Sequence, residues 1–289
     1  MKQDNINDRS KESNKLHYMI SLGAEMAGGA AGAALGMITG GPGLAVLMGA
    51  AGNGISKVLI DSTEKFLSNR EKARTGAAVA CAVTKVSNRL NDGITLRQDD
   101  FFDERLDGRS KNEELLEGIL LNSSNEHEEK KVKLLSNIYS NTIFMNSISL
   151  GEANHILKIA GNLTYRQLCV LSLAVRKTEI TNICLSKKYL SDNEHLINDV
   201  PVESISLRQE ILDMYRQGLI SSKVLEENNT GFASPRIELE DGNLVMNTWY
   251  DVVPDGINLT PLGKLCYELM DLEEIPTDDM FEVAIILQI

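Results

Sequence analysis

The residue types that most often do chemistry are scattered along this sequence. The four histidines and four cysteines are widely spaced, and no two cysteines form a Cys-x-x-Cys pair. One run, Glu126–Glu129, combines a histidine with three carboxylates and could contact a cation. Acidic residues also favour the first turn of a helix, so we interpret this run as a solvated helix start. The sequence therefore predicts no metal, no cofactor and no catalytic residue, and we do not expect an enzyme.

A second group of carboxylates occurs at Asp99–Asp100 and Asp103–Glu104, around the pair Phe101–Phe102. Paired carboxylates can hold a divalent cation, but acids in a polar loop are usually solvated. We predict that residues 94–111 form an acidic linker or loop with a short phenylalanine anchor.

Glycine-rich loops that bind phosphate are also excluded. Gly52-Asn53-Gly54 is followed by Ile55-Ser56-Lys57, which lacks the Gly-Lys-Ser/Thr order of the nucleotide loop. Neither this stretch nor Gly41-Pro42-Gly43 has the third glycine that a dinucleotide fingerprint requires. The glycines must serve another purpose.

That purpose is indicated by the segment from Met26 to Ser56, which contains no charged side chain. Its glycines recur every fourth residue and would form one smooth ridge on a helix, which allows another backbone to approach closely. Proline at position 42 interrupts the segment and predicts a helical hairpin. The helix-packing or membrane residues that we predict are Gly28, Gly32, Gly36, Gly40, Pro42 and Gly49.

Three interpretations of this hairpin remain open. It could be a helix pair packed in a soluble core, a pair that inserts conditionally into a membrane or oligomerises, or a stable two-span anchor. Each uncharged arm has about 13–15 residues and would be roughly 20–23 Å long as a helix. A hydrocarbon core about 30 Å thick prefers around 20 apolar residues, so the arms are weak constitutive spans. A further patch of small residues, Gly76–Ala82, could pack against the ridge.

The net charge of −12 is unevenly distributed. Residues 1–150 carry 18 basic and 19 acidic side chains, whereas residues 151–289 carry 11 and 22. An acidic second half repels phosphate backbones, so we do not expect nucleic-acid binding. A protein partner at the acidic half is the better expectation. The first fifteen residues mix acids and bases and do not resemble a secretory signal.

Hydrophobic periodicity predicts a mainly α fold: a glycine-rich helical hairpin and helical bundle, followed by a winged-helix-like α+β module. The helix that follows the hairpin should end near Asn91–Gly93. Further helices are expected at 112–121, 125–144 and 151–160. The predicted regions are a polar tail (1–15), the hairpin and long helix (16–93), the linker (94–111), a helical region (112–161), the winged-helix-like module (162–276) and an apolar tail (277–289).

The module is predicted from its order of elements. One helix begins near Leu163, and Ser206 is the expected N-cap of a second helix that would expose Arg208 and Arg216. Arg236–Glu240 and Asn243–Tyr250 flank Asp241-Gly242, a strong two-residue hairpin signal. Thr260-Pro261 should open the final helix. The apolar tail Phe281–Ile289 is interpreted as an added strand or docking segment.

Short motifs in the middle and at the end of the chain resemble the Abi-alpha-like abortive-infection proteins of bacteria. The motifs that carry the resemblance are Glu128-Glu129, Lys133-Leu134-Leu135-Ser136-Asn137, Ala153-Asn154-His155-Ile156-Leu157-Lys158, Leu163-Thr164 and Leu259-Thr260-Pro261-Leu262-Gly263. They cover about half of the chain. The resemblance implies a role in defence against phage and carries over no catalytic residues.

These observations lead to two expected functions. The first is a non-enzymatic anti-phage protein, cytoplasmic or associated with the inner membrane, that acts by self-association of the glycine ridge or by membrane perturbation. The alternative is a soluble protein-interaction scaffold or regulator with a winged-helix-like module. We expect a homo-oligomer in the first case.

Overall fold

The structure, a computed structural model, describes residues 69–106, 108–180, 201–222, 236–240, 243–247 and 256–287. These residues are mainly helical with short antiparallel strands, which confirms the expected mainly α class. The chain divides into two compact units. The first comprises Met1–Leu163 with Leu269–Asp271, and the second comprises Thr164–Glu268 with Leu272–Ile289. The predicted hairpin lies outside the described residues.

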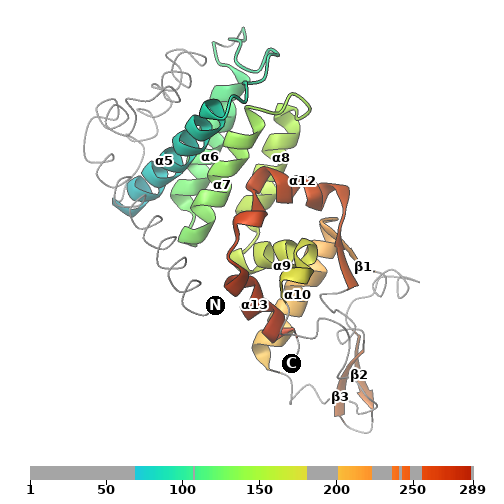
Figure 1. The fold of residues 1–289 in the computed structure, drawn as a ribbon. Coiled ribbons are helices and arrows are strands. Elements are labelled where there is room, and N and C mark those ends of the chain that lie inside the picture. Colours follow the sequence, from blue (N-terminus) through green and yellow to red (C-terminus); the bar gives the residue numbers. More distant parts are fainter. Residues whose placement is uncertain are drawn as a thin grey trace. The chain divides into compact units, whose positions relative to one another are not determined.

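The described part of the first unit contains four helices that lie side by side (Figure 1). Helix α5 packs against α6 and α7, and α8 packs against the same two helices. The helices are α5 (Asn69–Asn91), α6 (Lys111–Asn125), α7 (Glu129–Thr142) and α8 (Leu150–Asn162). The expected helices of this region are therefore present, and α5 ends at the predicted turn, where Gly93 adopts a φ of 81°.

Local capping determines where these helices begin. Ser110 accepts a hydrogen bond from the amide of Glu113, whose carboxylate accepts one from the amide of Ser110. The same reciprocal capping box joins Ser149 and Glu152 at the start of α8. Each box satisfies two helix-end donors that would otherwise lack a partner. The core between the helices is aliphatic, with Leu115, Ile119, Leu135, Ile138, Ile143 and Ile156 fully or almost fully buried.

The segment between α5 and α6 covers most of the residues that were expected to form an acidic linker or loop. It belongs to the first unit, and Phe101 is completely buried. The Phe101 carbonyl accepts a hydrogen bond of 3.0 Å from the Asn112 amide at the start of α6. The expected phenylalanine anchor is thus formed by Phe101, and its burial fixes the segment to the helical bundle.

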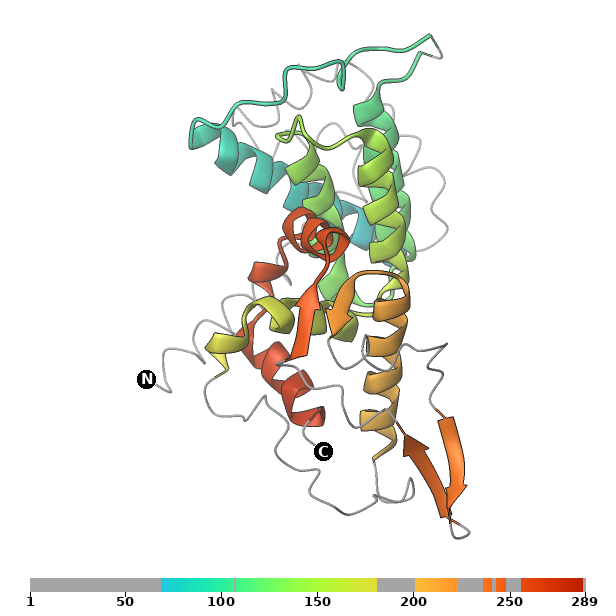
Figure 2. The same cartoon turned by 90° about the vertical axis from the view of Figure 1, so that its right-hand side faces the viewer.

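The second unit combines helices with short strands (Figure 2). The helical elements among its described residues are α9 (Tyr165–Val175), η1 (Lys177–Glu179), α10 (Val202–Arg216), α12 (Pro261–Met270), η5 (Leu272–Glu274) and α13 (Thr277–Ile286). Its strands are β1 (Ile220–Ser222), β2 (Arg236–Glu240), β3 (Asn243–Asn247) and β4 (Ile257–Leu259). Strand β1 pairs with β4 and β2 pairs with β3, both antiparallel. The pairing of Glu240 with Asn243 is the register expected for a two-residue hairpin.

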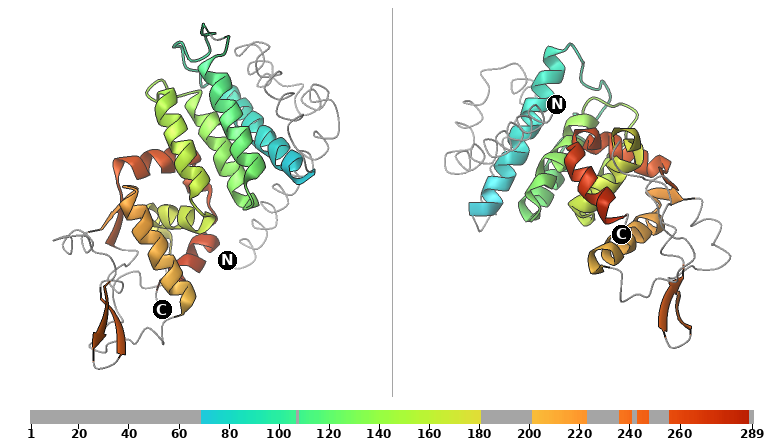
Figure 3. Two further views of the ribbon diagram at one scale, coloured as in Figure 1. Left: turned by 180° about the vertical axis from the view of Figure 1, so that it is seen from behind. Right: turned by 60° about the horizontal axis from the view of Figure 1, so that its bottom comes forward.

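Figure 3 shows α13 beside α9, as the packing of these two helices also indicates. The prediction of a strand at Phe281–Ile289 is wrong for the described part of that segment, because Thr277–Ile286 is helical. Helix α12 is consequently not the final helix. The predicted N-cap at Ser206 is also wrong, since α10 begins at Val202 and includes Ser206. Proline at position 201 precedes this earlier start.

Candidate functional site

The glycines chosen from the sequence as helix-packing or membrane residues cannot be located. Gly28, Gly32, Gly36, Gly40, Pro42 and Gly49 all lie outside the described residues. The small-residue patch Gly76–Ala82 is described, and it forms a buried part of α5. In the described part of the chain, no helix combines the length and the apolar character that are needed to cross a membrane.

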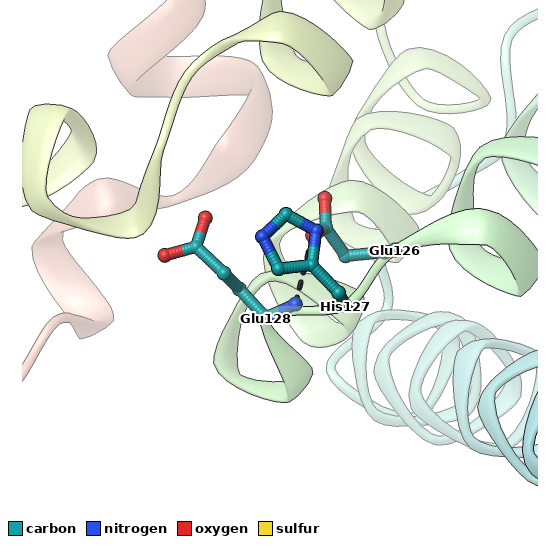
Figure 4. A group of neighbouring side chains, drawn as sticks. All are labelled: Glu126, His127 and Glu128. Atoms are coloured by element: carbon teal, nitrogen blue, oxygen red, sulfur yellow. Dashed lines mark hydrogen bonds and ion pairs between the residues drawn. The ribbon is translucent and has the colours of Figure 1, made fainter.

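The cluster at Glu126, His127 and Glu128 is the one group of potential metal ligands in the described residues (Figure 4). It occupies the corner between α6 and α7, where Glu126 ends one helix and Glu128 precedes the next. One ligand atom from each residue lies within 4.8 Å of the others. The side chain of His127 is exposed, whereas Glu126 is buried.

A lysine already supplies positive charge to this cluster. The Lys131 ammonium lies 2.5 Å from one carboxylate oxygen of Glu126 and 4.0 Å from a carboxylate oxygen of Glu128. The other oxygen of Glu126 accepts a hydrogen bond of 2.9 Å from the Glu128 amide. A divalent cation here would be repelled by the ammonium group. The arrangement therefore fits a structural ion pair better than a metal site, and Glu126 is not solvated as the sequence suggested.

The acidic loop likewise uses its carboxylates for internal pairs. Asp99 accepts two hydrogen bonds from the Arg97 guanidinium, at 2.7 and 2.5 Å. Asp100 pairs with Lys111 at 2.7 Å. The guanidinium beside Asp99 lowers the pKa of that carboxyl below its ordinary value, mainly through the hydrogen bond. These two acids therefore stabilise the loop instead of forming an open cation site.

Arg97 was not identified from the sequence, yet it organises one end of the first unit. Its guanidinium donates to the carbonyls of Thr142 and Ile148, at 3.2 and 2.9 Å, and lies 4.2 Å from the ring centre of Phe101. A cation near the last carbonyls of a helix is stabilised by the helix dipole, as here at the end of α7. The contacts join positions about 50 residues apart, so no local pattern could reveal them.

Two asparagines of α7 bind carbonyls from the segment Leu269–Asp271. Asn137 donates to the Met270 carbonyl at 3.0 Å, and Asn141 donates to the Leu269 carbonyl at 2.9 Å. Lys85 of α5 forms an ion pair with Asp271. These contacts satisfy carbonyls at a helix C-terminus, which have no partner within their own helix. Asn137 belongs to one of the motifs on which the family resemblance rests, and its observed role is structural.

The closing motif also has a structural explanation. The Thr260 hydroxyl accepts a hydrogen bond of 3.1 Å from the Gly263 amide and donates to the Gly218 carbonyl at 2.5 Å. A Cβ atom at Gly263 would overlap the Leu219 carbonyl oxygen. Threonine therefore caps α12, and glycine permits the close approach of α12 to the start of β1.

Ion pairs join the helices of the second unit. Arg166 at the start of α9 pairs with Glu210 of α10 at 2.5 Å. Arg176 at the end of α9 pairs with Glu179 at 2.6 Å and donates to the Ile275 carbonyl at 2.6 Å. The guanidinium of Arg176 lowers the pKa of Glu179, mainly by hydrogen bonding. The first pair connects α9 to α10, and the second connects the end of α9 to the short helix η1.

Two buried titratable groups of the second unit, Tyr165 and Cys266, have raised pKa values. The Tyr165 hydroxyl donates to Asp279 at 2.7 Å, and burial is the main cause that raises the pKa of this phenol. Burial also raises the pKa of the Cys266 thiol to about 12, which disfavours the reactive thiolate. Arg208, expected on the exposed side of α10, is buried instead, and Arg216 pairs with Asp213 at 2.9 Å.

The chain matches no protein-family model, no curated protein and no solved structure in comparisons with all three. The likeness to Abi-alpha-like proteins therefore rests on the sequence motifs alone.

Proposed function

We propose that this chain is a non-enzymatic anti-phage protein of the abortive-infection type. In this proposal the glycine ridge self-associates or perturbs the inner membrane, and the acidic second half holds or senses a protein partner. The observation that carries the proposal is the uncharged segment from Met26 to Ser56 with glycine at every fourth position of its first arm. The motif resemblance supplies the defence context.

In the described part of the chain, charged side chains form ion pairs with one another, and this supports a binding role over catalysis. Glu126 is engaged by Lys131, Asp99 by Arg97, and Glu210 by Arg166. These pairs hold helix ends and loops together, and their positions leave the carboxylates poorly suited to acid–base chemistry. These polar clusters of the described residues are therefore accounted for by structural contacts.

The test of this function compares two double variants that place leucine side chains on opposite faces of the same predicted helix. Gly32→Leu with Gly36→Leu fills the ridge, whereas Ala30→Leu with Ala34→Leu changes the opposite face of the same predicted helix. Bacteria that express equal amounts of each protein are challenged with phage, and their survival and the size of the assembled protein are measured. We expect the ridge variant to lose protection and assembly, and the control variant to keep both. Equal behaviour of the two variants would overturn the proposal.

A second candidate function is supported by the order of elements in the second unit. Helices α9 and α10 are followed by β1, the β2–β3 hairpin, β4 and α12. This order supports a winged-helix-like module with the hairpin as its wing, in a soluble interaction protein or regulator. The buried Arg208 and the Arg216–Asp213 pair leave α10 poorly suited to phosphate contacts.

Cell fractionation separates the two candidates. Movement of the protein into the membrane fraction after phage challenge would favour the first candidate. A protein that stays in the soluble fraction and neither assembles nor loses function in the ridge variant would favour the second. Binding of duplex DNA at low salt would be an unexpected third result and would assign a nucleic-acid role to the module.

A further inference from the structure

The C-terminal segment Leu272–Leu287, here called the C-terminal arm, packs mainly against α9 within the second unit (Figure 3). It consists of η5, a short connection through Pro276, α13 and the residue that follows α13. Its buried apolar side chains are Leu272, Ile275, Met280, Val283, Ala284 and Leu287. One helix therefore provides most of the surface on which the arm lies.

One face of α9 also carries polar groups that bind the arm. Residues seven and four apart share a face of a helix, and the donors at positions 165, 172 and 176 follow this spacing. Tyr165 donates to the Asp279 carboxylate at 2.7 Å, Ser172 to the Leu272 carbonyl at 2.8 Å and Arg176 to the Ile275 carbonyl at 2.6 Å. Because these directional contacts all come from α9, the same face of α9 in any copy of the chain could hold the arm in the same way.

The connection to the arm is a single strained residue. Asp271 alone separates the end of α12 at Met270 from the start of η5 at Leu272. Its φ is 50°, and it is the only residue other than glycine with a positive φ in the described part of the chain. This left-handed conformation is less favourable for aspartate than for glycine, which is the usual residue just after a helix.

An ion pair explains why aspartate occupies this position. The Asp271 carboxylate pairs with the Lys85 ammonium of α5, and the two side chains are only 14% and 17% exposed. Glycine would relieve the backbone but could not form the pair. The pair with Lys85 therefore holds Asp271 in its strained conformation.

We propose that the C-terminal arm is exchanged between two copies of this chain, with Asp271 as the hinge. In the exchanged dimer, the arm of each copy lies on α9 of the other copy. Exchange of an identical element re-forms the same contacts in both copies, and a short strained hinge favours it.

The hinge decides the balance between the closed chain and the exchanged dimer. The contacts between the arm and α9 are equal in number and kind in the two states, so they favour neither. Opening allows Asp271 to adopt an ordinary negative φ, but it separates the aspartate from Lys85 and requires two chains to associate. Lys85 thus restrains exchange, and the strain at Asp271 promotes it.

Arm exchange goes beyond the proposed function because it does not use the glycine ridge. Every residue that it requires lies in the described part of the chain. The ridge and the arm would bring copies together through separate contacts, so each can be removed without the other.

The hinge is tested by two variants that both remove the pair between Lys85 and Asp271. Lys85→Met leaves aspartate at the left-handed position, whereas Asp271→Gly also removes the strain, since glycine adopts positive φ readily. The dimer dissociation constant of each full-length variant is measured by sedimentation velocity, with far-ultraviolet circular dichroism to confirm folding. We expect Lys85→Met to dimerise more tightly than Asp271→Gly by about tenfold or more, because two strained hinges relax in each dimer. Equal dissociation constants would overturn the proposal.

The position of the arm is tested by a disulfide that only two chains can form, in a protein that keeps Lys85. The Tyr165 side chain interacts with both Asp279 and Cys169, which places these two positions close together. Two differently tagged copies are expressed together: one carries Asp279→Cys and Cys169→Ser, and the other is unchanged. After mild oxidation, we expect mass spectrometry to find a disulfide between Cys169 of the unchanged copy and the introduced cysteine.

The matched control for this trap is Glu282→Cys, which removes an exposed carboxylate of the same helix. It should give at least about tenfold less of the disulfide, since the bond requires close and correctly directed Cβ atoms. A single chain that carries Asp279→Cys and keeps Cys169 is oxidised in parallel and reports the disulfide within one chain.

These measurements separate the possible results. A disulfide within the single chain but none between the two copies would show that the arm stays on its own α9, which would overturn the proposal. No disulfide in either experiment would contradict the position of the arm on α9 and overturn it equally. Gly32→Leu with Gly36→Leu in both copies should leave the disulfide between copies unchanged, so failure of the ridge function and failure of arm exchange are distinguishable.

Discussion

Ion-paired side chains of the two units can be compared by their exposure to solvent. In the first unit, Arg97 and Lys131 have almost no exposed side-chain surface, and each is bound to a carboxylate or to carbonyl groups. In the second unit, the ion pairs of Arg166 and Arg216 remain partly open to solvent. A buried charge that loses its partner is costly, whereas an exposed one is solvated by water. Removal of a single charge should therefore cost more at Lys131 or Arg97 of the first unit than at Arg166 or Arg216 of the second.

The strongest test of this contrast is Glu126→Gln. The glutamine can still accept the hydrogen bond from the Glu128 amide, but the buried ammonium of Lys131 loses its counter-charge. We expect the free energy of unfolding to fall by about 3–5 kcal/mol, measured by urea denaturation. The matched control is Glu128→Gln, whose carboxylate is more exposed and 4.0 Å from Lys131, with a cost below about 1 kcal/mol.

The same ion pair predicts a partial rescue. Lys131→Met added to Glu126→Gln removes the unpaired charge and should restore at least about 1 kcal/mol of the lost stability. If the double variant is less stable than Glu126→Gln by the full cost of Lys131→Met, the two side chains are not coupled. The contrast between the units would then lose its clearest example.

The second unit should be most sensitive to a backbone approach rather than to a charge. Gly263→Ala places a Cβ atom against the Leu219 carbonyl, and a backbone oxygen cannot rotate away as a side chain can. We expect a loss of about 3 kcal/mol in the free energy of unfolding. Gly151→Ala near the start of α8 is the control, because its Cβ would meet no atom closer than 3.9 Å. Equal stability of the two variants would contradict the close approach.

Arg97→Gln tests the buried cation at the other end of the first unit. It leaves the Thr142 and Ile148 carbonyls with weaker or no partners, and we expect a loss of about 2–3 kcal/mol. Arg105→Gln removes an arginine of the same loop whose pair with Glu114 is exposed, so its cost should stay below about 1 kcal/mol. Both losses are measured by thermal and urea denaturation, and a cost of Arg105→Gln as large as that of Arg97→Gln would remove the distinction.

The smallest expected effect is a difference in acid sensitivity. Because the fold lowers the pKa of Asp99 and Glu179, each carboxylate contributes stability above its ordinary pKa and loses it as the pH falls through the lowered value. Asp99→Asn and Glu179→Gln should each cost less than about 1 kcal/mol near pH 6, since both side chains are substantially exposed.

The loss of stability caused by Asp99→Asn or Glu179→Gln should disappear in acid. The pH at which each loss begins to decline should differ between the two variants. The ordinary pKa is 3.8 for Asp99 and 4.5 for Glu179, so the Glu179 contribution should begin to decline at the higher pH. The measurement is the stability of each variant and of the native protein between pH 2 and 6. A cost that stays constant over this range would mean that the pKa of the carboxyl is not lowered by folding.

Most helices were predictable because their signals are local. Apolar periodicity located α6, α7 and α8, and Asn91–Gly93 correctly indicated the end of α5. The strand predicted for the C-terminal segment was wrong because Val283, Ile285 and Ile286 have β-branched side chains, and packing against α9 outweighed that weak preference. Acids in the first turn, Asp278 and Asp279, were a helix-start signal that could have corrected it.

The contacts that organise each unit were less accessible from sequence. Arg97 meets carbonyls that are 45 and 51 residues away, and such pairs leave no periodic pattern. Glu126 and Lys131 are only five residues apart, but a turn between two helices separates them, so helical spacing rules do not relate them. Composition could suggest that polar clusters existed, but only the fold shows which charges are buried.

The asparagines of α7 impose a condition on how the protein is made. Asn137 and Asn141 bind carbonyls of residues 270 and 269, which the ribosome adds more than a hundred residues later. At usual rates of translation, that delay is on the order of ten seconds. During this interval the nascent first unit holds two amide groups without their final partners. Completion of the helical bundle must therefore wait until residues 269 and 270 have been synthesised.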